Sequence, residues 1–361
     1  MSSDILLNIK MERVKKIDTT DLIKAFEQIS RIKNEINDLT IITNDLNDKM
    51  NYTPYMFENS NIRYYFNGLT SGNIILPSNI TKTYFINVNY PNNLNISSLT
   101  SSNYQYYFMN CIFGKLTFDK PNDFKFAGCF VDFLEIGVLN TSATLMFPTT
   151  LRTLVINSVF NTYYNEHLNL TGLTNLNTFT INQGTLPTPV KYISIQLPGS
   201  VNAVDIKMNN FRVDLKIDDN IPYNILLNKF IIEANYLNGL RCFKALNMYS
   251  SYDANSFRIN CSNIDIAYLE IDPSLMGLLK FIGSQPTFTI YNLIIKDYQH
   301  KSSFMIGSSW NSSLTNACDL TIKRLCFISG PYMTSTDFIN DLKKVINPNL
   351  STTITILTGL N

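Results

Sequence analysis

Acidic side chains are the residues of this sequence whose types and spacing could do chemistry. Enzymes that cleave glycans use two carboxyl groups about 5–10 Å apart. Glu270 and Asp272 stand two positions apart, so in a strand they would share one face. Further candidate sets are Asp132 with Glu135, and Asp214 with Asp218 and Asp219. Acids of this kind are ordinarily solvated, and nothing in the sequence isolates one of them as a proton donor.

Other catalytic signatures are missing from the sequence. It has two histidines, His167 and His300, and no GxxxxGK[ST], HExxH or GxSxG motif and no GxGxxG after a strand. Its six cysteines, at 111, 129, 242, 261, 318 and 326, form no C-x-x-C pair and match neither a zinc site nor a small disulfide scaffold. We therefore predict no enzymatic activity, no catalytic residue, no cofactor and no metal.

Composition narrows the class of partner. Of the 361 residues, 45% are hydrophobic and 16% charged, the latter below the roughly 25% of an average domain. The net charge of +1 provides no field that would attract nucleic acid or anionic lipid. No run approaches the ~18 apolar residues of a membrane helix. The start, MSSDILLNIKMERVKK, lacks the features of a signal peptide, so we expect a chain made in a cytoplasm and not inserted in a membrane.

From the N-terminus onward, the first predicted element that could position such residues is a helix over residues 21–50. Its apolar residues follow an alternating 3-4 spacing that predicts a coiled-coil seam within an oligomerisation segment at 18–50. Isoleucine at both seam positions favours a trimer over a dimer. The alternative is an amphipathic helix packed on the protein's own core. The predicted oligomerisation residues are Leu22, Ala25, Ile29, Ile32, Ile36, Leu39, Thr43, Leu46 and Met50.

After a junction at 51–72, the chain reads as short strands from 73 to 330. Most of these segments alternate apolar and polar residues, which gives each strand one buried face, and Asn, Gly, Ser and Pro separate them. The predicted class is therefore mostly β. Representative segments are 83–88, 115–120, 132–137, 178–183, 212–217, 229–234, 267–272, 292–297 and 319–324.

A cadence recurs inside this β-rich body: proline, then apolar residues three, six and eight positions later. Pro77, Pro148, Pro187 and Pro198 each begin one copy, the first with Thr83 in place of the second apolar residue, and a proline-free copy runs through 170–181. In a solenoid coil, the proline would fix the turn, the +3 residue would fill it, and the +6 and +8 residues would share the buried face of the next strand. The predicted core positions are Leu151, Leu154, Ile156, Leu176, Phe179, Ile181, Val190, Ile193, Ile195, Val201, Val204 and Ile206.

This cadence resembles the LPxxLxxLxI rhythm of irregular leucine-rich repeats of the BspA-like and FNIP types. The resemblance covers about a third of the chain and implies a β-solenoid. Unequal repeat lengths, such as the 11 residues from Pro187 to Pro198, depart from that family. A β-helix with variable coils, or a β-sandwich or jelly roll, would accommodate the same strands. A C-terminal cap at 331–361 is predicted as a helix over 335–346 followed by a strand at 351–360.

The order of these segments resembles the layout of bacteriophage virion fibres. That resemblance implies an N-terminal docking segment at 1–17, which anchors the chain to a capsid or tail protein, a homotrimeric coil, and a β body that binds a host surface protein or glycan. It also implies that the protein is made in the host cytoplasm and resides in the virion. The alternatives are a cytoplasmic leucine-rich-repeat-like interaction module, which needs no oligomer, and a fibre-borne glycan depolymerase.

Overall fold

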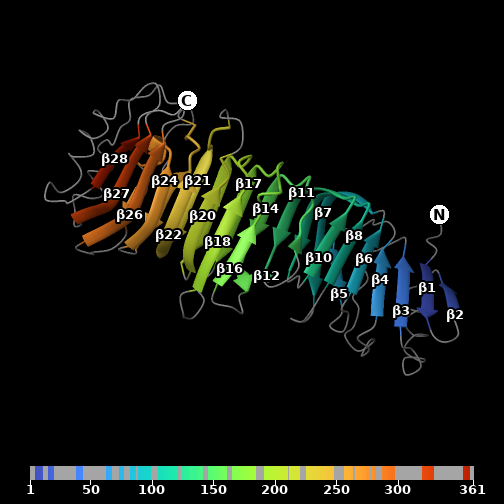
Figure 1. The fold of residues 1–361 in the computed structure, drawn as a ribbon. Coiled ribbons are helices and arrows are strands. Elements are labelled where there is room, and N and C mark those ends of the chain that lie inside the picture. The colour runs from blue at the N-terminus through green and yellow to red at the C-terminus, as the bar shows by residue number, and fades with distance from the viewer. Residues whose placement is uncertain are drawn as a thin grey trace. The chain divides into compact units, whose positions relative to one another are not determined.

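The computed structural model, whose strands are labelled in Figure 1, divides into two compact units, Met1–Thr162 and Tyr163–Asn361, each of which is described by itself. This boundary falls inside the predicted β body. The structure describes residues 5–10, 15–19, 38–43, 62–66, 73–76, 82–86, 88–98, 105–119, 123–140, 145–160, 165–183, 191–209, 211–219, 225–247, 256–262, 265–276, 278–281, 287–296, 319–328 and 353–357.

From residue 62 to residue 136, successive strands of the first unit alternate between two main sheets. One sheet has the order β13-β10-β8-β6-β4-β3-β1-β2, in which β1 pairs antiparallel with β2 and β3 and every other pair is parallel. Its strands are β1 (Ile5–Lys10), β2 (Lys15–Thr19), β3 (Asp38–Thr43), β4 (Ile62–Phe66), β6 (Lys82–Ile86), β8 (Gln105–Met109), β10 (Asp123–Ala127) and β13 (Leu145–Met146). Parallel pairing also joins β5 (Asn73–Leu76), β7 (Asn89–Ser98), β9 (Ile112–Phe118), β11 (Phe130–Ile136) and β14 (Thr153–Ile156), and separately β12 (Leu139–Asn140) and β15 (Val159–Phe160).

Aromatic rings stack through the first unit in register with its strands. Phe108 of β8 is the register partner of Phe85 in β6 and of Phe126 in β10. The ring centroids are 4.8 Å apart for Phe85–Phe108 and 4.6 Å apart for Phe108–Phe126, with nearly parallel planes. Because equivalent positions of successive coils lie one above another, an aromatic residue placed at the same position of each coil builds a continuous stack.

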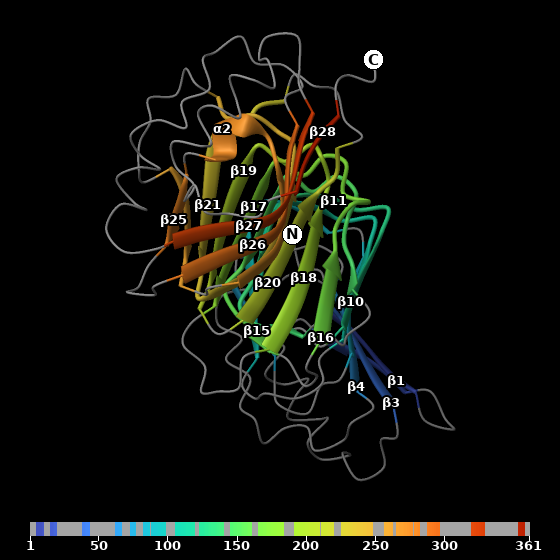
Figure 2. The same ribbon diagram turned by 60° about the vertical axis from the view of Figure 1, so that its left-hand side comes forward.

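The second unit repeats the alternation between two sheets, and their strands form separate layers (Figure 2). All pairings are parallel. The first sheet, which we name the β16–β28 sheet, contains β16 (Asn165–Asn169), β18 (Lys191–Leu197), β20 (Phe211–Ile217), β22 (Tyr236–Cys242), β24 (Asp265–Ile271), β26 (Thr287–Lys296), β27 (Asp319–Ile328) and β28 (Thr353–Leu357). The second contains β17 (Thr178–Gln183), β19 (Ala203–Met208), β21 (Lys229–Ala234), β23 (Phe257–Cys261) and β25 (Leu279–Phe281), and a short helix, α2 (Pro273–Met276), follows β24.

The proline cadence marks the turns between coils. The amide of Leu151 donates to the carbonyl of Pro148 (3.2 Å), and the amide of Val201 donates to that of Pro198 (3.3 Å). Every predicted core position that the structure describes is fully buried, with 0% of its surface exposed. Val190 lies outside the described residues. Parallel pairing in long sheets agrees with a solenoid-like fold and not with an antiparallel sandwich.

Part of the predicted N-terminal helix is wrong. Leu39 and Thr43 lie in β3, which pairs with β1 and β4. The segment LTIIT at 39–43 is rich in β-branched residues, which favour an extended chain, and β1 offers it a partner strand. The other predicted oligomerisation residues, Leu22, Ala25, Ile29, Ile32, Ile36, Leu46 and Met50, lie outside the described residues.

At the other end of the chain, β28 occupies the strand predicted over 351–360, whereas the helix predicted over 335–346 is outside the described residues. Within the part of the chain that the structure describes, no helix is both long enough and apolar enough to cross a membrane.

Candidate binding site on the outer face of the β16–β28 sheet

Side chains on the outer face of the β16–β28 sheet line up in rows across its strands. Outer residues alternate with the buried core, as exposed Lys216 does between Leu215 and Ile217. Parallel register then places equivalent residues of neighbouring strands side by side. One row, the Asp214 row, contains Ser194, Asp214, Gly239, Tyr268, Asn292 and Arg324. The next, the Lys216 row, contains Gln196, Lys216, Arg241, Glu270, Ile294 and Cys326.

A β-bulge doubles the number of outer residues along part of the Asp214 row. The register between β20 and β22 shifts after Val213, so that both Asn238 and Gly239 lie between buried Leu237 and Leu240. The same spacing, two residues between two buried ones, recurs at 267–268, 291–292 and 323–324 in the following strands. A bulge adds one residue to a strand locally, and here the repetition adds polar and aromatic side chains to the outer face.

Asp214 is a buried carboxylate at the start of this bulged region. It is 5% exposed, accepts a hydrogen bond from the hydroxyl of Tyr192, and receives the side-chain amide of Asn238 at 3.2 Å on both oxygens. Burial, followed by the hydrogen bond and charge of Asp214, raises the pKa of Tyr192 to about 12. Tyr192 therefore stays protonated and donates to the carboxylate at any physiological pH.

Tyr268 lies directly over Gly239. A Cβ at position 239 would come within 2.2 Å of Tyr268 Cε1 and 2.5 Å of Asp214 Oδ1, so only glycine leaves room for the ring. The Nζ of Lys216 is 5.6 Å from the centroid of the same ring. The Tyr268 hydroxyl is buried, and this burial, followed by the charge and the hydrogen bonding of nearby Asp214, raises its pKa.

A cavity of about 630 Å³ continues from Tyr268 over the next strands. Arg241 lies beside Glu270, a residue that lines the cavity. Its Nε is 3.6 Å from the Glu270 carboxylate, and a terminal nitrogen is 3.2 Å from that of Asp219. The amide nitrogen of Asn292 donates to the carbonyl of Ala267 (3.1 Å), which leaves the Asn292 side-chain oxygen as an acceptor. The lining residues are Tyr268, Glu270, Asn292, Leu293, Ile294, Lys323, Arg324, Leu325 and Cys326.

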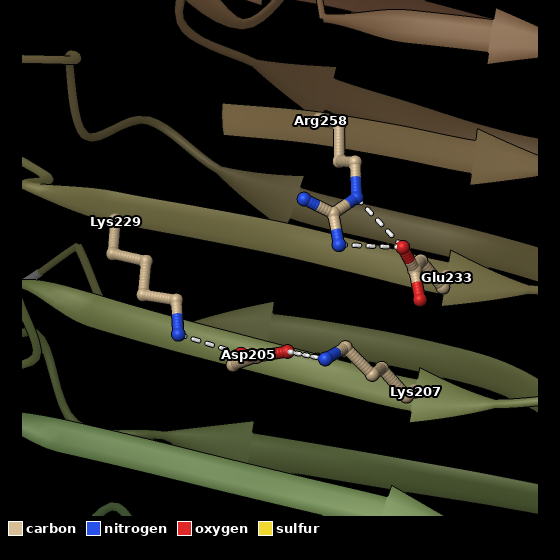
Figure 3. A network of polar contacts seen from close by, with 5 residues as sticks. All are labelled: Asp205, Lys207, Lys229, Glu233 and Arg258. Atoms are coloured by element: carbon tan, nitrogen blue, oxygen red, sulfur yellow. Dashed lines mark hydrogen bonds and ion pairs between the residues drawn. The ribbon is translucent and has the colours of Figure 1, made fainter. Parts of the chain in front are cut away.

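Charges on the other sheet of this unit are arranged differently. Asp205, 7% exposed, has Lys229 at 2.6 Å and Lys207 at 3.8 Å, and Arg258 lies 2.6 Å from Glu233 (Figure 3). The Lys229–Asp205 and Arg258–Glu233 pairs connect neighbouring strands, whereas Lys207 and Asp205 lie in the same strand, β19. We therefore assign the two pairs between strands a role in holding successive coils together. Lys207 and Arg152, two of the residues between the core positions, both lie near acids, and Arg152 is 3.6 Å from Asp132.

In the structure, several of the predicted acids lie beside bases, amides or hydroxyls. Glu270 lines the cavity, but β24 ends at Ile271, and Asp272 is 1% exposed and accepts hydrogen bonds from the amide and hydroxyl of Ser274. Lys115, 2.7 Å away, and Asn157 lower the pKa of Glu135, the opposite of what a general acid requires. Asp214 accepts hydrogen bonds from Tyr192 and Asn238, and Asp219 lies beside Arg241. Among the described residues, no group of three or more His, Cys, Asp or Glu could hold a metal.

Reasoning from the sequence missed Tyr192, Asn238 and Tyr268. Their meeting depends on parallel register across coils of unequal length and on the bulge after Val213, neither of which a single sequence specifies. One signal was available: Gly239 is an isolated glycine inside the strand-like segment YLNGLRC, which often marks a bulge or a close approach.

Comparison of the chain with protein-family models, with curated proteins and with solved structures gave no match.

Proposed function

We propose that this chain is a structural fibre protein of a bacteriophage particle, that it assembles as a homotrimer, and that its N-terminal segment anchors it to a capsid or tail protein. In this proposal the irregular coils form a β-helix or leucine-rich-repeat-like body that binds a host glycan or surface protein without an enzymatic step. The support is the order of segments in the sequence together with the long parallel sheets, since stacked coils make a stiff body suited to a projecting fibre.

The cavity beside Tyr268 is the observation that carries the binding part of the proposal. It combines an aromatic ring, the acceptor oxygen of Asn292, and the two exposed cations Lys323 and Arg324, which have no ion pair with a described residue. Its floor includes the apolar Ile294. Aromatic faces and aligned polar groups suit a sugar ring, and cations add preference for a carboxylate. A glycan with acidic sugars therefore fits this site best.

Binding is tested with the full chain against alginate and polysialic acid, with neutral dextran for comparison. We expect the acidic polymers to bind more tightly than dextran. Replacing Lys323 and Arg324 together by glutamine should weaken that binding at least tenfold, because two charge-assisted contacts are lost. The matched control is Arg212→Gln, which removes an exposed cation from β20 of the same sheet outside the cavity. Equal losses in both variants would contradict a site at the cavity.

Residence in the particle is tested separately by mass spectrometry of purified virions and by antibody labelling in electron microscopy. The chain should co-purify with particles at a copy number divisible by three. Its absence from particles would overturn the fibre assignment and would leave the binding result standing. Incubation with the bound polymer, followed by end-group analysis, should leave the polymer intact, whereas new chain ends would indicate a depolymerase.

A further inference from the structure

Two cysteines meet at a corner shared by two consecutive coils of the first unit. Met109 is the register partner of Ala127, and Ile112 is the register partner of Phe130. The number of residues that separates the two partners along the chain is therefore the same before and after the corner. Cys111 and Cys129 lie between these pairs and are therefore neighbours across the two coils. Adjacent strands are ~4.8 Å apart, which lies within the Cα separation of ~4.4–6.8 Å that a disulfide spans.

The two corners have the same backbone shape. Each cysteine follows a left-handed residue, Asn110 with φ 53° and Gly128 with φ 63°. A Cβ on Gly128 would lie 2.6 Å from the Asn110 side-chain oxygen, so the upper corner sits closely on the lower one. Hydrogen bonds continue through the corner, from the Asn110 amide to the Ala127 carbonyl (2.9 Å) and from the Phe130 amide to the Cys111 carbonyl (2.8 Å). Equal backbone shapes direct both side chains the same way.

The two sulfur atoms have different surroundings. Cys111 is fully buried, and its thiol lies 3.3 Å from the carbonyl of Phe85 and 3.2 Å from that of Met109. Cys129 is partly exposed, and its sulfur accepts the backbone amide of Cys111 at 3.4 Å. Exposed apolar side chains, Ile112 at 47% and Phe130 at 44%, flank the corner. A small neutral reagent can therefore reach Cys129, while Cys111 stays behind it.

Electrostatics separates the roles of the two thiols. A hydrogen bond from the Cys111 thiol, followed by the amides of the corner, lowers the pKa of Cys129 to about 7, whereas the same hydrogen bond and burial raise the pKa of Cys111. The lowered pKa makes Cys129 the readier of the two cysteines to form a thiolate, which is the nucleophilic form. Burial raises the pKa of Cys242 and of Cys261 to about 12, which leaves those thiols unreactive.

We propose that Cys129 and Cys111 form a peroxide-reactive pair, in which Cys129 is the attacking and Cys111 the resolving thiol. The Cys129 thiolate attacks one oxygen of a hydroperoxide, the O–O bond breaks, and a sulfenic acid and hydroxide form. The Cys111 sulfur then attacks the Cys129 sulfur and displaces its oxygen. The hydroxyl leaves as water with the proton of the Cys111 thiol. Two thiols are oxidised by two electrons and one peroxide is reduced to two waters or, for an organic peroxide, to water and an alcohol.

The product is a disulfide that ties two neighbouring coils at their corner. It closes a loop of less than twenty residues and joins groups that are already in contact, so little native strain is needed. This chemistry requires no ligand in the cavity and no particle, so it stands or falls apart from the proposed function.

The test treats the native full chain with a slight excess of hydrogen peroxide at pH 7 and maps the unreduced peptides by mass spectrometry. We expect a linked peptide containing Cys111 and Cys129, with Cys242 and Cys261 still reduced as internal controls. Cys129→Ser should abolish the linked peptide. Cys111→Ala should leave Cys129 as a sulfenic acid that dimedone traps. A chain that keeps its native circular dichroism but forms links only between molecules, or oxidises Cys129 without linking it, would overturn the proposal.

A second measurement follows the rate of Cys129 alkylation by iodoacetamide between pH 5 and 10. The groups that act on this sulfur are the Cys111 thiol and the corner amides, so one titration is expected, with half-maximal rate near pH 7. Replacing Cys111 with alanine removes the donated hydrogen bond and should move the midpoint upward. An unchanged midpoint in Cys111→Ala would show that the two thiols do not interact.

Discussion

Gly239 is the residue on which the packing of the outer face depends. Its missing side chain lets the ring of Tyr268 lie against the strand and lets Asp214 approach from the other side. The cavity begins at this ring. A single glycine thus connects the buried carboxylate with the proposed ligand contacts.

Replacing Gly239 with alanine should therefore disturb both stability and binding. The added Cβ would overlap Tyr268 and Asp214, at 2.2 and 2.5 Å, and overpacking of this kind costs about 1–3 kcal/mol. We expect urea unfolding to show that loss, together with weaker glycan binding. The matched control is Gly172→Ala, where nothing lies within 4 Å of the new Cβ, and which should change stability by less than about 0.5 kcal/mol. Equal effects of the two substitutions would contradict the close approach.

Single-residue burial was the part of the structure that the sequence predicted best. Leu154 and Ile156 follow Pro148 at spacings that only a turn followed by a strand can bury together, and both are fully buried. Tyr192 and Tyr268 carry no comparable local signal. They come from different coils, and their meeting at Asp214 depends on how much chain each loop uses.

Lys244 links elements that are far apart in the sequence. Its ammonium donates to the carbonyls of Gly199 (2.7 Å) and Val201, at the proline-containing turn before β19. The turn carbonyls, which have no strand partner of their own, thereby gain a charged donor. The contact is made at a cost, since burial lowers the pKa of Lys244 to about 8 from an ordinary 10.5.

This lowered pKa predicts a pH dependence with a definite sign. Between pH 8 and 10.5 the unfolded chain holds a proton on Lys244 that the folded chain has released, so stability from this group rises with pH in that window. The buried cysteines act in the opposite direction in both wild type and Lys244→Met, and the charge of Lys244 lowers the pKa of one of them, Cys242. We expect the stability of wild type relative to Lys244→Met, from urea unfolding, to increase by roughly 1–3 kcal/mol across the window. Parallel curves for the two proteins would contradict this role.

A strand could be predicted from the sequence where its local residue pattern agreed with the strand that it pairs with in the structure. The segments at 178–183 and 229–234 were expected as strands and are β17 and β21 with the same bounds. The segment at 38–43 satisfied two patterns, a heptad seam and a β-branched run, and pairing with β1 favours the strand. A heptad pattern cannot reveal such a partner, because the partner lies in a part of the sequence outside the repeat.

At the scale of the whole molecule, β3 shortens the segment that remains for self-association. The heptad positions before it are Leu22, Ala25, Ile29, Ile32 and Ile36. Isolated helices shorter than ~12–15 residues are marginal in water, so a coil of this length must draw its stability from association. A trimer held by these residues alone should therefore depend on protein concentration.

Light scattering of the full chain should give a mass about three times its 41.2 kDa at tens of micromolar and lower values on dilution. Placing aspartate at both Ile29 and Ile32 should yield a monomer, because each helix would bury charges at the seam without partners. The matched control, Ser30→Asp, adds charge at an outward heptad position and should leave the trimer intact. Unchanged circular dichroism would show that the β body still folds in all three proteins. A wild-type monomer at high concentration, or a trimer that survives both isoleucine substitutions, would show that residues 22–36 do not assemble the chain.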